Sequence, residues 1–151
     1  MTKVQRFATK VKTYMGAVTQ IDEVTCQSAA IVAVTGGVRS VDSIRAELVR
    51  YGVAGDPANM AETLKALLPQ DKYELHLQAS IEQMREWARQ GCAMITHGYF
   101  TGAGHVIVID GWEAGRGFDV MDPYEEFCGP SWTYPKRHNR KAYNGFYSEL
   151  M

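Results

Sequence analysis

The chain has 151 residues, of which 46% are hydrophobic and 22% are charged, and its 16 Lys and Arg stand against 17 Asp and Glu. These values predict one folded domain, exclude intrinsic disorder, and argue against a nucleic-acid binder, which would carry a strong basic excess. The three cysteines are an odd number, so they predict a reducing compartment and no disulfide framework.

The N-terminal region lacks the features of a secretory signal. Lys10 and Lys12 interrupt any apolar run there, so we expect synthesis in the cytoplasm. The longest stretch without Asp, Glu, Lys or Arg, residues 90–109, contains two histidines and four glycines. This stretch predicts two strands and a loop, and we expect no stable insertion into a membrane.

Four helices are predicted from start signals and apolar periodicity. An apolar run follows Cys26 and ends at two glycines, and Ser40 is an N-cap for the next helix. The pair Asp56 and Pro57 starts a third helix, and Ser80 with Gln83 forms a capping-box pattern for a fourth. The predicted helices cover about residues 26–35, 41–51, 57–68 and 81–90.

Strands are predicted mainly in the second half of the chain. Residues 73–78 alternate, with Tyr73, Leu75 and Leu77 on the predicted buried side. The segment 105–112 is apolar on both faces, which predicts a strand covered on both sides. Residues 118–122 form the return strand of a hairpin that Pro123 ends. With a short strand at 91–95, this order predicts an α+β domain in which N-terminal helices pack on a C-terminal antiparallel sheet.

Cys26 is the best candidate for a nucleophile. It stands at the start of a helix, where unpaired backbone N–H groups and the helix dipole stabilise a thiolate. Gln20, six residues upstream, has an amide that could donate to an oxyanion together with the Cys26 N–H. The alternative is that Cys26 is a small buried hydrophobe at a helix start.

His105 and Asp122 are the candidates for a base and its orienter. His105 opens the most apolar strand, directly after a glycine-rich loop, and Asp122 ends the return strand of the same hairpin. Neighbouring antiparallel strands would bring the two together, so that a carboxylate orients the imidazole. The turn length leaves the register open by a few residues, and Asp119 and Asp110 are therefore alternative orienters.

These segments resemble the papain-like cysteine peptidases that process bacteriocin leaders, the double-glycine peptidase-like family. The resemblance is carried by Gln20-Ile-Asp-Glu-Val-Thr-Cys26 with Ala29 and Ala30, by Gly104-His105-Val-Ile-Val-Ile-Asp-Gly111, and by Asp122-Pro123-Tyr124. It implies a papain-like fold with Cys26 as nucleophile, His105 as general base and acid, Asp122 as orienter and Gln20 as oxyanion donor. It covers about residues 15–125, the expected core, and leaves 126–151 as a C-terminal extension of the single domain 1–151.

The sequence departs from this family after the nucleophile. The family usually has Gly after the Cys, whereas Gln27 and Ser28 follow Cys26 here, so we expect Gln27 to narrow the approach to the sulfur. The usual tripeptide occurs instead at Cys128-Gly129-Pro130, where no long helix can start and no glutamine lies six residues upstream. Cys128 is thus a weak candidate, and Cys92, in an apolar strand, is expected in the core.

Other residues have less specific interpretations. We expect Gly104, Tyr99 and Trp112 to border the substrate, although aromatic residues often only pack. A zinc site is a weak alternative, because no compact ligand pair is present, and no metal or organic cofactor is expected. Its possible ligands are Cys92, His97, His105 and Cys128. Basic residues gather near both ends, at Lys3, Arg6, Lys10 and Lys12 and at Lys136, Arg137, Arg140 and Lys141.

The sequence therefore predicts a cysteine peptidase that cleaves a peptide bond through a thioester acyl-enzyme. Family members that process leaders are commonly fused to transporter segments, which this chain lacks, so we expect a stand-alone enzyme. A phage or bacterial lysin acting on peptidoglycan peptides after release fits that expectation, and basic ends would attract an anionic wall. The alternatives are a leader-peptide or protein-processing protease and a non-catalytic binding or assembly module.

Overall fold

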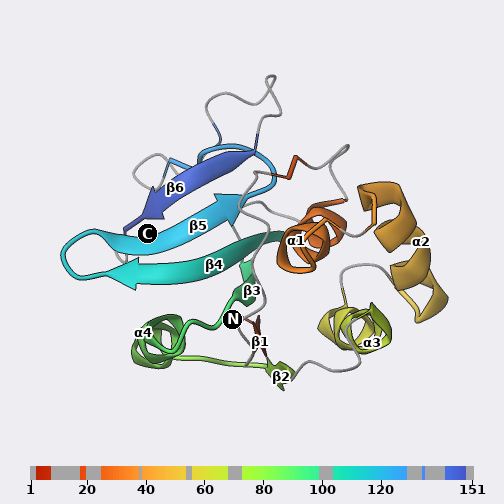
Figure 1. Ribbon diagram of the computed structural model, residues 1–151, viewed down its shortest axis with the longest axis horizontal. Helices are drawn as coiled ribbons and strands as arrows, with labels where there is room; N and C mark the ends of the chain where they lie inside the picture. The colour runs from red at the N-terminus through yellow and green to blue at the C-terminus, as the bar shows by residue number, and fades with distance from the viewer. Residues whose placement is uncertain are drawn as a thin grey trace.

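The structure is a computed structural model that describes residues 3–7, 18–19, 25–37, 39–53, 56–67, 73–98, 104–128, 134 and 142–148. In these residues, helices precede most of the strands, as the α+β prediction requires (Figure 1). The elements are β1 (Lys3–Phe7), α1 (Cys26–Val34), α2 (Val41–Arg50), α3 (Pro57–Leu67), β2 (Tyr73–His76), α4 (Ile81–Arg89), β3 (Met94–Gly98), β4 (His105–Glu113), β5 (Gly117–Asp122) and β6 (Tyr143–Tyr147).

The strands form one antiparallel sheet in the order β2-β1-β3-β4-β5-β6. Its last four strands are consecutive in the chain, and the helices pack against them, which confirms the predicted fold class. Two strands were not predicted. β1 inserts between β2 and β3, and β6, in the segment expected to be an extension, pairs with β5 from Phe118 opposite Tyr147 to Asp122 opposite Tyr143.

Strand β4 is covered on both faces, as its unbroken apolar sequence predicts. Side chains alternate across a strand, so Val106 and Val108 join one core cluster with α1, whereas Ile107 and Ile109 join a second cluster with α4. Figure 1 shows α1, α2 and α3 together beside the sheet and α4 apart from them, and α4 packs against β4. The sheet is thus held between two hydrophobic cores.

Helix α1 is the central helix of the first core. All of its residues after Cys26 are buried, from Gln27 to Val34, so this helix has no solvent-exposed face of the kind that an ordinary surface helix has. Helix α2 begins at its predicted N-cap, where the Ser40 side chain accepts from the Ser43 N–H. Helix α4 begins with the predicted capping box of Ser80 and Gln83. The fixed position of α1 matters most, because it carries the candidate nucleophile.

The predicted buried side of the strand at 73–78 is wrong. Leu75 and Leu77 are 39% and 58% exposed, whereas the ring of His76 packs against Trp87 of α4 with 4.6 Å between the ring centroids. Strand β2 is an edge strand followed directly by α4, and α4 lies on the side to which His76 points. The ring of His76 therefore faces α4, and Leu75 and Leu77 do not.

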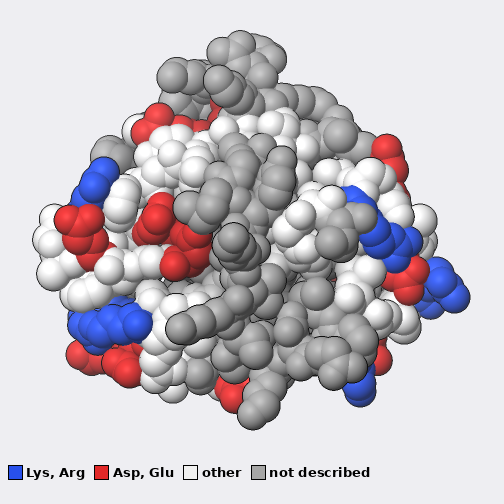
Figure 2. Space-filling model, in the orientation of Figure 1, with Lys and Arg blue, Asp and Glu red and all other residues white. Residues whose placement is uncertain are grey.

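In the described residues, no helix combines the length and the apolar character that crossing a membrane requires. Acidic and basic side chains are interspersed on the face shown in Figure 2, as a near-neutral composition predicts.

Candidate active site

Cys26 is the first residue of α1 and the only one of that helix whose side chain is partly exposed. The buried remainder of α1 fixes this position, and the first backbone N–H groups of a helix have no partner within it. A reactive cysteine needs this combination of a fixed backbone and an accessible sulfur.

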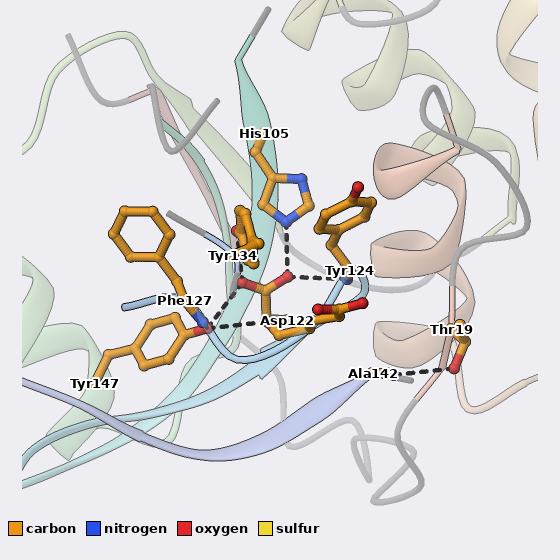
Figure 3. A network of polar contacts seen from close by, with 9 residues as sticks. Thr19, His105, Asp122, Tyr124, Phe127, Tyr134, Ala142 and Tyr147 are labelled. Atoms are coloured by element: carbon orange, nitrogen blue, oxygen red, sulfur yellow. Dashed lines mark hydrogen bonds and ion pairs between the residues drawn. The ribbon is translucent and has the colours of Figure 1, made fainter. Parts of the chain in front are cut away.

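His105 is the first residue of β4, and its side chain is 5% exposed. Gly104 precedes it with a φ of 87°, a left-handed conformation that a residue with a Cβ adopts only with strain. This backbone lets the chain enter β4 with the imidazole directed to the end of β5. There the Nε2 atom of His105 lies 2.7 Å from Oδ1 of Asp122 (Figure 3).

Asp122 ends β5 and is completely buried, yet its carboxylate is well supplied with hydrogen bonds. Oδ1 accepts from His105 and from the Tyr124 N–H at 2.9 Å. Oδ2 accepts from the hydroxyls of Tyr134 and Tyr147, both at 2.9 Å. A buried charge is tolerated when its acceptor positions are filled in this way. Two donors on each oxygen thus hold the carboxylate in place beside the imidazole.

The site brings the His105 ring to Cys26 as well as to Asp122. Burial alone would lower the pKa of His105, but hydrogen bonds to Asp122 and to Cys26 and the charges of both outweigh it and raise this pKa to about 9. Asp122 occupies Nε2, which leaves Nδ1 for the sulfur. Near neutral pH the imidazole therefore carries a proton that it can donate. A thiol, an imidazolium and a carboxylate in this order can form a nucleophile, acid–base and orienter system.

Asp122, and not Asp119 or Asp110, is the carboxylate that meets His105. Residues 109 to 111 form a β-bulge in β4, and Gly111 on its far side pairs with Asp119. Burial and then the charge of Asp119 raise the pKa of Asp110 to about 6. The two alternative orienters thus form a separate acidic pair farther along the hairpin.

The remaining predicted residues do not all lie at this site. Gln20 and Tyr99 fall outside the described residues. Gln27 is buried, at 3% exposure. Trp112 lies near the other end of β4, about 23 Å along the strand from His105, where the guanidinium of Arg89 stacks over its ring. Its contact with substrate therefore stays a prediction.

The other two cysteines lie in different surroundings. Cys92 is buried in the second core, as expected, and Cys128 is partly exposed. Within the described part of the chain, no group of three His, Cys, Asp or Glu side chains is arranged to hold a metal ion.

Two residues at the site had no predicted role there. Tyr147 comes from β6, and Tyr134 lies between β5 and β6. The Ala142 N–H, just before β6, donates to the Thr19 hydroxyl at 3.1 Å, which joins the C-terminal segment to the segment before Cys26 (Figure 3). The alternation of Tyr143, Gly145 and Tyr147 is a strand signal, but a weak one. Nothing in it indicates pairing with β5.

A cysteine at the start of a buried helix, facing a histidine and an aspartate on an antiparallel sheet, defines the papain-like class of fold and site. The model of the peptidase C39-like family matches residues 12–151, so the chain belongs to that family. No match was found among curated proteins or among solved structures. The family match indicates a cysteine peptidase, as the sequence predicts, with a peptide as substrate.

Proposed function

We propose that this protein hydrolyses a peptide bond through a thioester acyl-enzyme, with Cys26 as nucleophile, His105 as general acid and base, and Asp122 as orienter. The observation that carries the proposal is the buried hydrogen bond between His105 and Asp122 beside the partly exposed Cys26. Gln20 enters the proposal as oxyanion donor through its place in the sequence, six residues before Cys26, and through the family resemblance.

The proposed reaction needs only Cys26, His105, Asp122 and one water molecule. The Cys26 thiolate attacks the peptide carbonyl, and the imidazolium of His105 gives its proton to the leaving amine as the C–N bond breaks. The neutral imidazole then takes a proton from water, whose oxygen attacks the thioester carbonyl. The carboxylic acid leaves, and the thiolate and the imidazolium are restored. Asp122 accepts the hydrogen bond from His105 Nε2 and stabilises the imidazolium.

Alkylation by iodoacetamide near neutral pH, followed by peptide mapping, tests this assignment. We expect Cys26 to be labelled first, because its partly exposed sulfur lies beside the imidazolium of His105, whereas Cys92 is buried. Cys128 is the internal control, since it is also partly exposed. Preferential labelling of Cys128 or Cys92 would overturn the assignment. Failure of Cys26 to react with any electrophile would favour the non-catalytic module.

For the substrate we propose peptidoglycan peptides, cleaved after the protein is released from the cell that makes it. The support is the basic sequence near both ends, which would attract an anionic wall. The resemblance to leader-processing peptidases supports a leader peptide instead. The turbidity of purified cell walls separates the two, with the Cys26→Ala protein as control. Clearing by the wild type alone supports the wall substrate, and intact walls together with a cleaved leader peptide overturn it.

A further inference from the structure

Two tyrosine hydroxyls meet the oxygen of Asp122 that does not face His105. Tyr147, at the end of β6, and Tyr134 each place a hydroxyl 2.9 Å from Oδ2. The Tyr147 hydroxyl also lies 3.2 Å from the Glu125 carbonyl, but its single proton goes to the carboxylate, which is the closer and charged acceptor. Both phenols therefore donate to the same atom.

The Tyr147 hydroxyl is itself fixed by the main chain. It accepts from the Phe127 N–H at 2.8 Å, so its lone pair and its proton both have partners. Tyr147 is joined to β5 through strand pairing with Phe118, and Tyr143 stacks on its ring at 5.3 Å. The hydroxyl thus has little freedom to leave Oδ2.

Tyr134 is fixed by ring packing. Its ring meets the ring of His105 edge to face at 5.6 Å and contacts the rings of Tyr124 and Phe127 at 4.8 and 5.1 Å. Tyr134 is 6% exposed, so it also separates the His105 and Asp122 pair from water. Burial and then the charge of Asp122 raise the pKa of both phenols, so they remain protonated donors at every pH at which the protein would work.

We propose that Tyr134 and Tyr147 are positioning residues that hold Oδ2 of Asp122 and thereby keep Oδ1 on Nε2 of His105. A carboxylate bound at one oxygen only can rotate or take up a proton. With Oδ2 bound by two neutral donors and Oδ1 by Tyr124 and His105, the carboxylate of Asp122 stays in the plane that the imidazolium needs. The inference rests on the proposed function, because it assigns the tyrosines a role in the same Cys26 chemistry.

The pH dependence of Cys26 alkylation by iodoacetamide tests this role. Each of Tyr147→Phe and Tyr134→Phe removes one donor to Oδ2 and keeps the ring, so Oδ1 of Asp122 is held less firmly on Nε2 and the imidazolium beside Cys26 loses support. We expect the acid limb of the rate profile to move up by about one pH unit in each variant. Among the described residues, the charged or titratable groups that face Asp122 or the His105 ring are His105, Cys26 and three tyrosines, Tyr134, Tyr147 and Tyr124.

Tyr143→Phe is the matched control. Tyr143 lies on the same strand as Tyr147, but its hydroxyl donates to the Phe146 carbonyl at 3.4 Å and not to Asp122. We expect its profile to overlay on that of the wild type. A purely structural role for Tyr147 would lower the melting temperature without moving the acid limb.

The outcomes separate this inference from the proposed function. If Cys26 of the wild type is labelled but both phenylalanine variants keep the wild-type acid limb, or move it down, the positioning role is wrong and the nucleophile stands. If Cys26 of the wild type is not labelled, the proposed function itself fails. Should Tyr147→Phe not fold, Tyr134→Phe decides, because among the described residues the Tyr134 hydroxyl bonds to Asp122 alone.

Discussion

The Nε2 atom of His105 and the Oδ1 atom of Asp122 are 2.7 Å apart although 17 residues separate them in the chain, and both side chains are buried. The β4–β5 hairpin brings them together, because antiparallel pairing returns the chain to the end of β4 at which it began. An ion pair shielded from water in this way is the main reason that the imidazole holds a proton near neutral pH.

Replacing Asp122 with Asn should test this pair directly. The amide keeps the shape but has no charge, and its NH₂ group must face either the imidazolium or the two phenols, which are all donors. We expect the rate of peptide cleavage to fall by about 10²–10⁴-fold, with a smaller change in KM. Steady-state kinetics measure this on whichever substrate the wild type cleaves. Asp119→Asn is the matched control, because that carboxylate lies on the same strand but pairs at Gly111, and it should keep wild-type kinetics.

Replacing Cys26 with Ala should abolish turnover and leave the fold intact. The side chain is small and partly exposed, so its loss leaves little cavity, whereas the reaction loses its nucleophile. We expect cleavage to fall by more than about 10³-fold with a near wild-type thermal transition. Cys128→Ala should retain activity. If Cys128→Ala is inactive and Cys26→Ala is active, the nucleophile is Cys128 and the assignment of Cys26 is wrong.

The stability of the protein should depend on the charge of His105. The pKa of this group is raised to about 9 from 6.5, so its contribution is fully present below pH 6.5 and is lost as the pH rises through 9. The shift corresponds to roughly 3 kcal/mol in the free energy of unfolding. Denaturant unfolding under reducing conditions at pH 6 and pH 9.5 measures the loss. In His105→Gln the decline over this range should be much smaller, and an equal decline would mean that another group causes it.

Much of the fold and part of the site follow from short-range signals in the sequence. The capping box of Ser80 and Gln83 and the cap at Ser40 depend on residues within one turn, so they fix helix starts wherever the helix packs. The hairpin is also local, and it is enough to predict that His105 approaches a carboxylate on the return strand. The choice among Asp122, Asp119 and Asp110 was not predictable, because it depends on the bulge between Ile109 and Gly111.

What the sequence did not predict depends on long-range pairing. Tyr147 reaches Asp122 from 25 residues away, and the Ala142 N–H reaches Thr19 across 123 residues. No local pattern specifies such partners, because β6 forms by pairing with the edge of β5, which is distant in the sequence. The prediction of which side of β2 is buried was wrong because that side also depends on a contact with a distant segment. The tertiary contact of His76 with Trp87 overrode the apolar alternation of Leu75 and Leu77.

The left-handed backbone of Gly104 should be needed for the position of His105. An added Cβ at Gly104 would lie 3.7 Å from the Gly98 carbonyl, an ordinary contact, so the strain of Gly104→Ala comes from the φ of 87° and costs about 1–2 kcal/mol. Gly91→Ala is a close control, because Gly91 has a similar φ of 77° and open space around it. Gly91 follows the end of α4 and does not adjoin His105 in the chain. We expect both variants to lose similar stability by denaturant unfolding. Only Gly104→Ala should slow Cys26 alkylation, because relief of the strain there moves the imidazole. Equal alkylation rates in the two variants would show that β4 holds His105 without help from the preceding turn.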